Sequence, residues 1–357
     1  MKKLAVFFLG LVTLIFVGRQ VFLPKMIEQS FAKLASQNIG INPIASLDDG
    51  LHVYMCGAGS PLPDPQRSGP CIGVVAGEQV FVFDAGTNGS QNLGPMGVPG
   101  PLIDEIFLTH LHSDHFDGLG QLMLSTWVGG RKTPVQITGP IGTAQIVDGF
   151  NTAYKIDSTY RTAHHGAAVA NPAGYGGTAR EVDLSGGGSK VVHDKDGVTI
   201  TAFSVSHEPV DPAFGYRIDY KDRSIAISGD TAYDTNIAAA AKDVDVLFHE
   251  ALNMEMVKTL ESAAKANGAK AMEKIFFDIQ DYHTSPVDAA KIAKQAGASD
   301  LVLYHIVPML PRDAMIPMFV KGADKEFDGK ITVSKDGTIL RLPVGSDEII
   351  YEQNTGL

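Results

Sequence analysis

Residues 109–120 read Thr-His-Leu-His-Ser-Asp-His-Phe-Asp-Gly-Leu-Gly, and this stretch decides what fold and chemistry we expect of the chain. With 11 histidines in 357 residues, a six-residue window would hold roughly 0.2 histidine by chance, whereas the window starting at His110 holds three. In an extended backbone, residues i and i+2 point to the same side, so His110 and His112 can bind one ion while Asp114 and His115 turn toward a second. Imidazole and carboxylate groups suit Zn²⁺, Mn²⁺ or Fe²⁺, so the segment predicts a metal site.

Three later segments carry further candidate ligands. His207 stands in Ser-His-Glu-Pro, Asp230 stands in Ser-Gly-Asp-Thr, and His305 stands at the end of a predicted strand. The pattern His-x-His-x-Asp-His after a strand, followed by these three residues in order, resembles the metallo-β-lactamase superfamily. The resemblance implies an α/β (α+β) fold, a four-layer αββα sandwich, with a site for two divalent ions at one edge. Zinc is the expected metal, and Mn²⁺ or Fe²⁺ would suit the same donors. The ligands that the resemblance implies are His110, His112 and His207 for one ion, Asp114, His115 and His305 for the other, and Asp230 as the bridge.

Within that superfamily, segments between residues 50 and 310 resemble the ribonuclease Z branch. They include Phe-His-Glu-Ala at 248–251 and Tyr-His-Thr-Ser at 282–285, which leads into a predicted helix. The resemblance implies that His283 donates a proton to the leaving group and that Glu250 orients His283. A carboxylate on one ring nitrogen fixes the tautomer of a histidine and raises its basicity. Asp114 is then expected both to bind metal and to position the attacking hydroxide.

Three features argue at this stage against a nucleic-acid substrate. The ribonuclease Z branch carries a long arm that grips transfer RNA between its Gly-Tyr-Arg and Ser-Gly-Asp-Thr segments, and here only residues 218–227 separate the two. The net charge is −11, whereas phosphate binding needs a surplus of Lys and Arg. The N-terminus resembles an export signal. We therefore expect a small anionic ester as substrate and no nucleic acid, and we allow for a homodimer.

The function expected on these grounds is an extracytoplasmic, dinuclear, metal-dependent hydrolase of small sulfate or phosphate esters. It would resemble arylsulfatases and phosphodiesterases, with a metal-held hydroxide as the nucleophile. A lactonase or other carboxylic-ester hydrolase with the same metal site is the alternative. A nuclease and a metal-binding module without turnover are two further readings, and the complete ligand set with an acid–base pair speaks against the latter.

The N-terminal segment has the pattern of a signal peptide or membrane anchor. Lys2 and Lys3 precede an uncharged apolar run over residues 4–18, without a small-x-small cleavage site after it. We expect the protein in the periplasm or secreted, or held at the inner membrane by this segment alone. The domain boundaries expected from the sequence are 1–24 for the signal or anchor, 25–48 for a linker helix, 49–345 for the hydrolase domain and 346–357 for a C-terminal tail.

The composition of the chain is that of a globular protein, since 44% of its residues are hydrophobic. The strands predicted from apolar runs cover residues 80–83, 106–109, 135–138, 198–204, 214–220, 224–228, 244–248, 301–304 and 331–333. The helices predicted from apolar periodicity cover residues 119–127, 143–152, 237–241, 254–266 and 286–295. Lys335-Asp336-Gly337 carries the signal of a hairpin turn.

Two regions are expected to shape the site from outside the ligand set. Residues 163–188, rich in Gly and Ala, are predicted to form a long loop, and the candidate substrate-binding side chains are Arg161, His164 and His165 at its start and Tyr233 after the Ser-Gly-Asp-Thr segment. Cys56 and Cys71 bracket a Gly- and Pro-rich loop, and the sequence leaves open whether they form a disulfide or stay as two buried thiols.

Overall fold

The structure is a computed structural model that describes residues 18–354, and the chain divides into two compact units with their boundary between Ser46 and Leu47. The first unit contains the π-helical turn η1 (Gly18–Phe22), the helix α2 (Leu23–Asn38) and the 3-10 turn η2 (Ile44–Ser46). Among residues 18–354 no helix is both long and apolar enough to cross a membrane. Most of the predicted signal or anchor segment, residues 1–17, lies outside the described residues.

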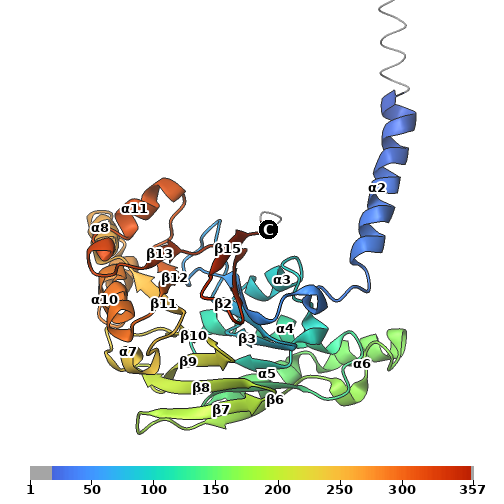
Figure 1. Cartoon of the computed structure of the whole chain (residues 1–357), viewed down its shortest axis with the longest axis horizontal. Helices are drawn as coiled ribbons and strands as arrows, with labels where there is room; N and C mark the ends of the chain where they lie inside the picture. Colours follow the sequence, from blue (N-terminus) through green and yellow to red (C-terminus); the bar gives the residue numbers. More distant parts are fainter. Residues whose placement is uncertain (1–17, 355–357) are drawn as a thin grey trace, which may run out of the picture. The chain divides into compact units, whose positions relative to one another are not determined.

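The second unit is built on two β-sheets (Figure 1). The strands of the first are β1 (Gly50–Gly57), β2 (Cys71–Ala76), β3 (Gln79–Phe83), β4 (Glu105–Phe107), β5 (Val135–Pro140), β6 (Gly177–Val182), β14 (Thr338–Pro343) and β15 (Ile350–Gln353). The strands of the second are β7 (Ser189–Lys195), β8 (Val198–Val205), β9 (Ala213–Tyr220), β10 (Arg223–Ile227), β11 (Val246–Leu252), β12 (Asp300–Val307) and β13 (Lys330–Val333). The spatial order is β15-β14-β1-β2-β3-β4-β5-β6 in the 8-stranded sheet and β13-β12-β11-β10-β9-β8-β7 in the 7-stranded sheet.

The main core lies between the facing sheets. Phe83 and Phe107 stack with ring centroids 5.0 Å apart in the first sheet, and both rings contact Tyr216 of the second sheet. The hydroxyl of Tyr216 donates to the carbonyl oxygen of Leu108 at 2.6 Å, which satisfies a polar group that would otherwise be buried alone. This core joins β4 of the first sheet to β9 of the second, and the predicted ligand loop begins just beyond β4.

Helices cover the outer faces of both sheets (Figure 1). They are α3 (Gly89–Leu93), α4 (Leu119–Trp127), α5 (Thr143–Ala153), α6 (Lys155–His165), α7 (Asn236–Ala240), α8 (Met254–Ala266), α9 (Lys270–Asp278), α10 (Pro286–Ala296) and α11 (Ile316–Phe319). Short 3-10 turns are η3 (Gly100–Leu102), η4 (Ser113–His115), η5 (Pro172–Gly174), η6 (Asp313–Met315) and η7 (Ala323–Lys325). A second core, in which Ala293 and Ile292 of α10 meet Leu301 and Leu303 of β12, binds the helix layer to its sheet. The expected four-layer αββα sandwich is confirmed.

Three local expectations need correction or completion. Residues 163–188 are no continuous loop, because α6 runs on to His165 and residues 177–182 form β6, which pairs in parallel with β5. The turn at 335–337 joins no hairpin, because β13 belongs to one sheet and β14 to the other. Cys56 and Cys71 form a disulfide, which answers a question that the sequence left open. In addition, the strand β15 lies within the stretch expected to be a C-terminal tail and pairs with β14.

Candidate metal centre and catalytic site

The loop after β4 turns four side chains toward one point. The Nε2 atom of His110 lies 3.0 Å from the Nδ1 atom of His112. One turn further on, in η4, the Nε2 atom of His115 lies 3.5 Å from Oδ2 of Asp114. The loop is extended up to His112 and then forms the 3-10 turn η4. The first pair therefore comes from the extended part of the loop and the second pair from the turn. This is the division into two pairs that the spacing of the cluster predicts.

The other sheet brings the remaining three predicted ligands to the same place. His207 follows β8, Asp230 follows β10, and His305 lies in β12. Oδ2 of Asp230 lies 3.2 Å from Nε2 of His305, 3.4 Å from Nε2 of His115 and 3.9 Å from Nε2 of His110. This carboxylate therefore stands between the two groups of donor atoms. The seven side chains form one group of His110, His112, His207 and Asp230 and a second of Asp114, His115 and His305, with the donor atoms of each group within 4.8 Å of one another.

Local backbone geometry explains how Asp230 and His305 reach the site. Gly229 has a φ of +65°, and a Cβ atom there would lie 2.2 Å from the carbonyl oxygen of Phe214, so only glycine fits before Asp230. The register between β11 and β12 slips at His305, which has no partner between Tyr304 and Ile306 and has a φ of 46°. Such a bulge turns one side chain out of the regular alternation of a strand, and here it turns His305 toward Asp114.

The electrostatics at three of the candidate ligands, His110, His207 and Asp230, favour the protonation states that metal binding needs. Burial lowers the pKa of His207 to about 4 and holds the pKa of His110 well below its usual value, so both rings are neutral near pH 7. Burial would raise the pKa of Asp230, but the rings of His305, His115 and His110 outweigh it and lower that pKa well below its usual range. The ionised carboxylate of Asp230 and the neutral rings of His110 and His207 can each offer an electron pair to a metal ion.

The donor positions fit divalent ions. Two donors bound 2.0–2.1 Å from one tetrahedral ion lie about 3.4 Å apart, close to the separations seen between these side chains. Within residues 18–354, Nε2 of His115 and Oδ1 of Asp230 are buried without any hydrogen-bond partner, and both belong to the cluster. A buried polar atom without a partner is costly, and a bound cation removes that cost. The residues present thus suit the group that the fold implies.

Asp84 supports this site and was missed by the sequence reasoning. Its carboxylate accepts from the backbone N–H and the hydroxyl of Thr109 at 2.8 and 2.9 Å and lies 2.8 Å from Nδ1 of His115. These contacts leave Nε2 of His115 to face the cluster. Burial would lower the pKa of His115, but the charges of Asp230, Asp84 and Asp114 raise it well above its usual value while no cation is bound. A signal for Asp84 existed, because it directly follows β3, whose parallel neighbour β4 leads into the ligand loop.

The predicted acid–base pair also lies at the cluster. Nδ1 of His283 lies 3.2 Å from Oε2 of Glu250, whose Oε1 accepts from the backbone N–H of Thr284 at 2.6 Å. Burial would lower the pKa of His283, but the charge of Glu250, with those of Asp230 and Asp114, raises it above its usual value. His283 and Glu250 are both buried, with Glu250 the deeper of the two. The pair can therefore hold a proton on His283 and keep the ring in one orientation.

A cavity of about 290 Å³ opens beside the cluster. Its lining includes His112, Asp114, Asp230, His283 and His305. The four weaker candidates for substrate binding are not part of that lining. Arg161 pairs with Asp157 at 2.6 Å on the exposed helix α6, which ends with His164 and His165 in solvent. The hydroxyl of Tyr233 accepts from Gln295 at 3.3 Å, and its ring is 44% exposed.

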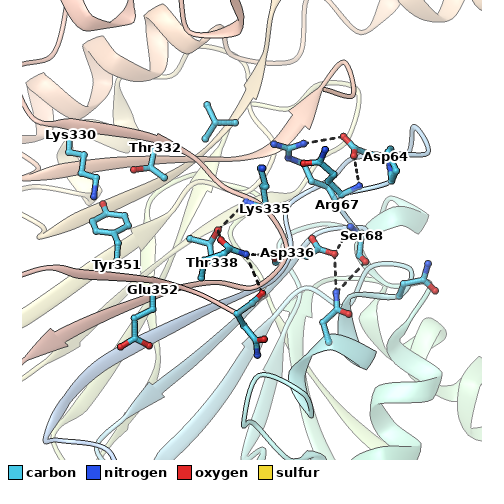
Figure 2. Close-up of a pocket in the computed structure, with 17 residues that line it drawn as sticks. Asp64, Arg67, Ser68, Lys330, Thr332, Lys335, Asp336, Thr338, Tyr351 and Glu352 are labelled. Atoms are coloured by element: carbon cyan, nitrogen blue, oxygen red, sulfur yellow. Dashed lines mark hydrogen bonds and ion pairs between the residues drawn. The ribbon is translucent and has the colours of Figure 1, made fainter. Parts of the chain in front are cut away.

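The loop closed by the disulfide supplies one rim of this cavity and is anchored from behind. Figure 2 shows the anchor, where Asp336 faces the loop in a second cavity of about 820 Å³. The carboxylate of Asp336 accepts from the backbone N–H groups of Ala58 and Ser68 at 3.1 and 2.8 Å and from Asn92 at 2.9 Å. In the same loop, Nε of Arg67 donates to the carbonyl oxygen of Ser334 at 2.9 Å. These bonds explain how a Gly- and Pro-rich loop holds one position beside the site.

Comparison with known proteins identifies the class to which this fold and site belong. The family model described as "Beta-lactamase superfamily domain" matches residues 80–306. The protein named Ribonuclease Z of Mycobacterium avium (strain 104) is 34% identical over 289 residues, which cover 80% of this chain and 96% of that protein. Its namesake from Mycobacterium bovis (strain BCG / Pasteur 1173P2) is 32% identical over the same shares of the two chains.

Solved structures share the fold at lower identity. The short form of human tRNase Z superposes with a TM-score of 0.57 at 22% identity and covers 82% of this chain and 100% of its own. The protein YhfI of Bacillus subtilis superposes with a TM-score of 0.58 at 19% identity, covering 82% of this chain and 99% of its own. These likenesses extend over the sandwich that carries the seven side chains.

The chain belongs to the metallo-β-lactamase superfamily, and it is a metal-dependent hydrolase of ester bonds. Within the superfamily it falls in the ribonuclease Z-like branch, as the segments around His283 and Glu250 indicate. Divalent metal ions follow from this membership, and the His and Asp groups of the cluster are their candidate ligands.

Two expectations are overturned by these relatives. The predicted hydrolysis of small sulfate or phosphate esters is wrong, and so is the exclusion of nucleic acid, because the relatives are named as ribonucleases. A net charge of −11 does not exclude nucleic acid, because it describes the whole surface and not the field at the site. The connection between β9 and β10 is short, and none of the seven candidate ligands lies in it.

Proposed function

We propose that this protein is a ribonuclease that hydrolyses phosphodiester bonds of RNA with two divalent ions, for which zinc suits the donors. The observation that carries the proposal is the meeting of seven His and Asp side chains with the buried pair His283–Glu250 at one cavity, in a chain 34% identical to a ribonuclease Z. His110, His112 and His207 would hold one ion, and Asp114, His115 and His305 would hold the other, with Asp230 between them.

When bound, such a pair of ions supplies Lewis acidity at the phosphate and makes a water molecule nucleophilic at neutral pH. The chain's own residues do the rest. Asp114 is partly exposed at the cavity, and its carboxylate can accept a proton or a hydrogen bond from the attacking water. His283, held through Nδ1 by Glu250, has Nε2 free to give a proton to the ribose oxygen that leaves. Because Glu250 is buried, solvent screens its charge little and the charge acts on His283.

The local charge explains how an acidic protein can accept RNA here. The predicted ligands include only the two carboxylates of Asp114 and Asp230, so two divalent ions would make the cluster positive. A phosphodiester is then attracted to the cavity although the surface as a whole repels it. We expect few phosphate contacts beyond the metal cluster.

The proposal is tested with the full chain loaded with zinc or manganese. Its substrates would be a 5′-labelled precursor transfer RNA and an unstructured RNA of the same length. Cleavage that disappears in Asp114→Ala, and that falls by about 10²–10⁴-fold in His283→Ala with metal content retained, supports the proposal. If the metal-loaded protein leaves both RNAs intact, the protein is not a ribonuclease.

A further inference from the structure

One wall of the catalytic cavity is apolar and has no role in the proposed chemistry. Besides its His and Asp side chains, the cavity of about 290 Å³ is lined by Leu62, Ile275, Ile279 and Val307. Ile275 is 47% exposed, although it lies beside some of the most polar groups of the protein. An isoleucine left partly in water at the rim of a metal site suggests that a ligand covers it.

The wall is built on rigid elements. Ile275 belongs to α9 and Ile279 follows it directly, and α9 packs against α8. Phe276 is buried in a small core with Leu252, Val257 and Val307, against which Ile279 packs. The side-chain amide of Gln280 donates to Glu261 of α8 at 2.8 Å and so ties the end of α9 to its neighbour. The packing of α9 against α8 and the small core therefore holds both isoleucines in the lining of the cavity.

An aromatic ring completes this side of the cavity. Tyr282 is half-buried in the lining, with its ring centroid 5.0 Å from that of His207 and 4.8 Å from that of His283. Leu62 reaches the wall from the disulfide-closed loop that Asp336 anchors. The cavity thus combines metal-binding His and Asp side chains, which suit an anionic phosphate, with apolar side chains, which suit a flat apolar group.

We propose that the wall of Ile275 and Ile279 packs against the nucleobase next to the scissile phosphate, which makes these two residues determinants of substrate specificity. The inference rests on the proposed ribonuclease function and deepens it. The base is the flat, weakly hydrated part of an RNA chain, whereas ribose and phosphate are strongly polar, so only the base gains from an apolar wall. Enzymes and single-strand binding proteins commonly hold unstacked bases on aromatic or apolar side chains.

The experiment compares RNA oligonucleotides that differ at one base. The cleavage position is first mapped with the metal-loaded wild type, and an abasic ribose is then placed on the 5′ or the 3′ side of that bond. Loss of the packed base should lower kcat/KM of the wild type by about tenfold on one of the two sides. The double variant Ile275→Ser/Ile279→Ser should cleave the intact RNA about tenfold more slowly and no longer distinguish intact from abasic RNA.

Two comparisons separate this result from damage to the fold. The double variant should cleave the abasic RNA as fast as the wild type, which shows that its metal cluster is intact. Phe277→Ser alters another exposed apolar residue of α9, 63% exposed and absent from the cavity lining, and should keep the wild-type preference for the intact base. An equal abasic penalty in wild type and double variant, or no penalty in the wild type, would overturn the inference while leaving the ribonuclease function standing. A wild type that cleaves no RNA would instead overturn the function and this inference with it.

Discussion

At the scale of single residues, Asp84 decides which way the ring of His115 faces. Its carboxylate contacts the backbone and hydroxyl of Thr109 as well as Nδ1 of His115. We expect Asp84→Ala to weaken metal binding by about 10–100-fold, because the ring of His115 loses the partner that orients it. Metal content after dialysis against a graded chelator measures this change. Asp117→Asn, an exposed carboxylate just after the ligand loop, should retain metal like the wild type, and a metal affinity unchanged in Asp84→Ala would contradict the role given to Asp84.

The pair Glu250–His283 predicts how activity depends on pH. The charge of Glu250 raises the pKa of His283, and a general acid works only while it is protonated, so activity should fall as the pH rises through this raised pKa. Glu250→Gln removes the charge and lowers the pKa of His283, so the alkaline limb of kcat should move to lower pH. Profiles of kcat against pH for wild type and variant measure the shift. Glu255→Gln, exposed at the start of α8, serves as control, and an alkaline limb that stays in place in Glu250→Gln would remove His283 from the acid role.

At the scale of elements, the loop between β1 and β2 depends on one carboxylate from the connection between β13 and β14. Asp336 accepts hydrogen bonds from Ala58, Ser68 and Asn92, and burial raises its pKa. Asp336→Ala leaves these donors without their partner and should lower the free energy of unfolding by about 1–3 kcal/mol. Denaturant unfolding measures the loss. Glu352→Ala changes a more exposed carboxylate of the same cavity and should stay within about 0.5 kcal/mol of the wild type, so equal effects of the two substitutions would contradict the anchoring role.

Also at this scale, the bulge in β12 matters more to the site than the strand's regular part. The strand is predictable from its apolar run, and its neighbours β11 and β13 pair with it in parallel. The one-residue shift that turns His305 toward the cluster is visible only in the pairing of the two strands. It depends on where the register between β11 and β12 changes. The predicted strand at 301–304 thus continues through His305, and the bulge in this strand places the ligand.

At the scale of the whole molecule, the acidic surface predicts a weak dependence of RNA cleavage on salt. Each phosphate neutralised by Lys or Arg in a single-stranded RNA changes log K by about 0.7 per decade of salt. With a net charge of −11 and no arm between β9 and β10, we expect log(kcat/KM) to fall with a slope of about −1 to −2. Cleavage rates measured between about 50 and about 300 mM potassium chloride give the slope. A slope near −5 would indicate an extended basic surface and would contradict recognition centred on the metal cluster.

The location of the protein stays a prediction, since it depends on residues 1–24. A charged start and an apolar run favour export, and the disulfide between Cys56 and Cys71 suits an oxidising compartment. In a bacterial host, the full chain should be found in the membrane or periplasmic fraction with both cysteines protected from alkylation, whereas the chain without residues 1–24 should remain in the cytoplasm with reduced thiols. A full chain found in the cytoplasmic fraction with both thiols free would refute export.

By itself the sequence predicted the metal cluster at residues 110–115 and many of the strands and helices, because closely spaced His and Asp residues and apolar runs are local patterns. The sandwich and the other three ligands followed from the resemblance to the metallo-β-lactamase superfamily. Composition misled where it was applied to the substrate, since net charge averages over a surface and a site does not. Only the tertiary structure decided that Asp84 orients His115, that Asp336 anchors the disulfide loop and that Ile275 faces the metal cluster. Each of these arrangements joins residues that are far apart in the chain. The packing of the two sheets and their helices brings them together.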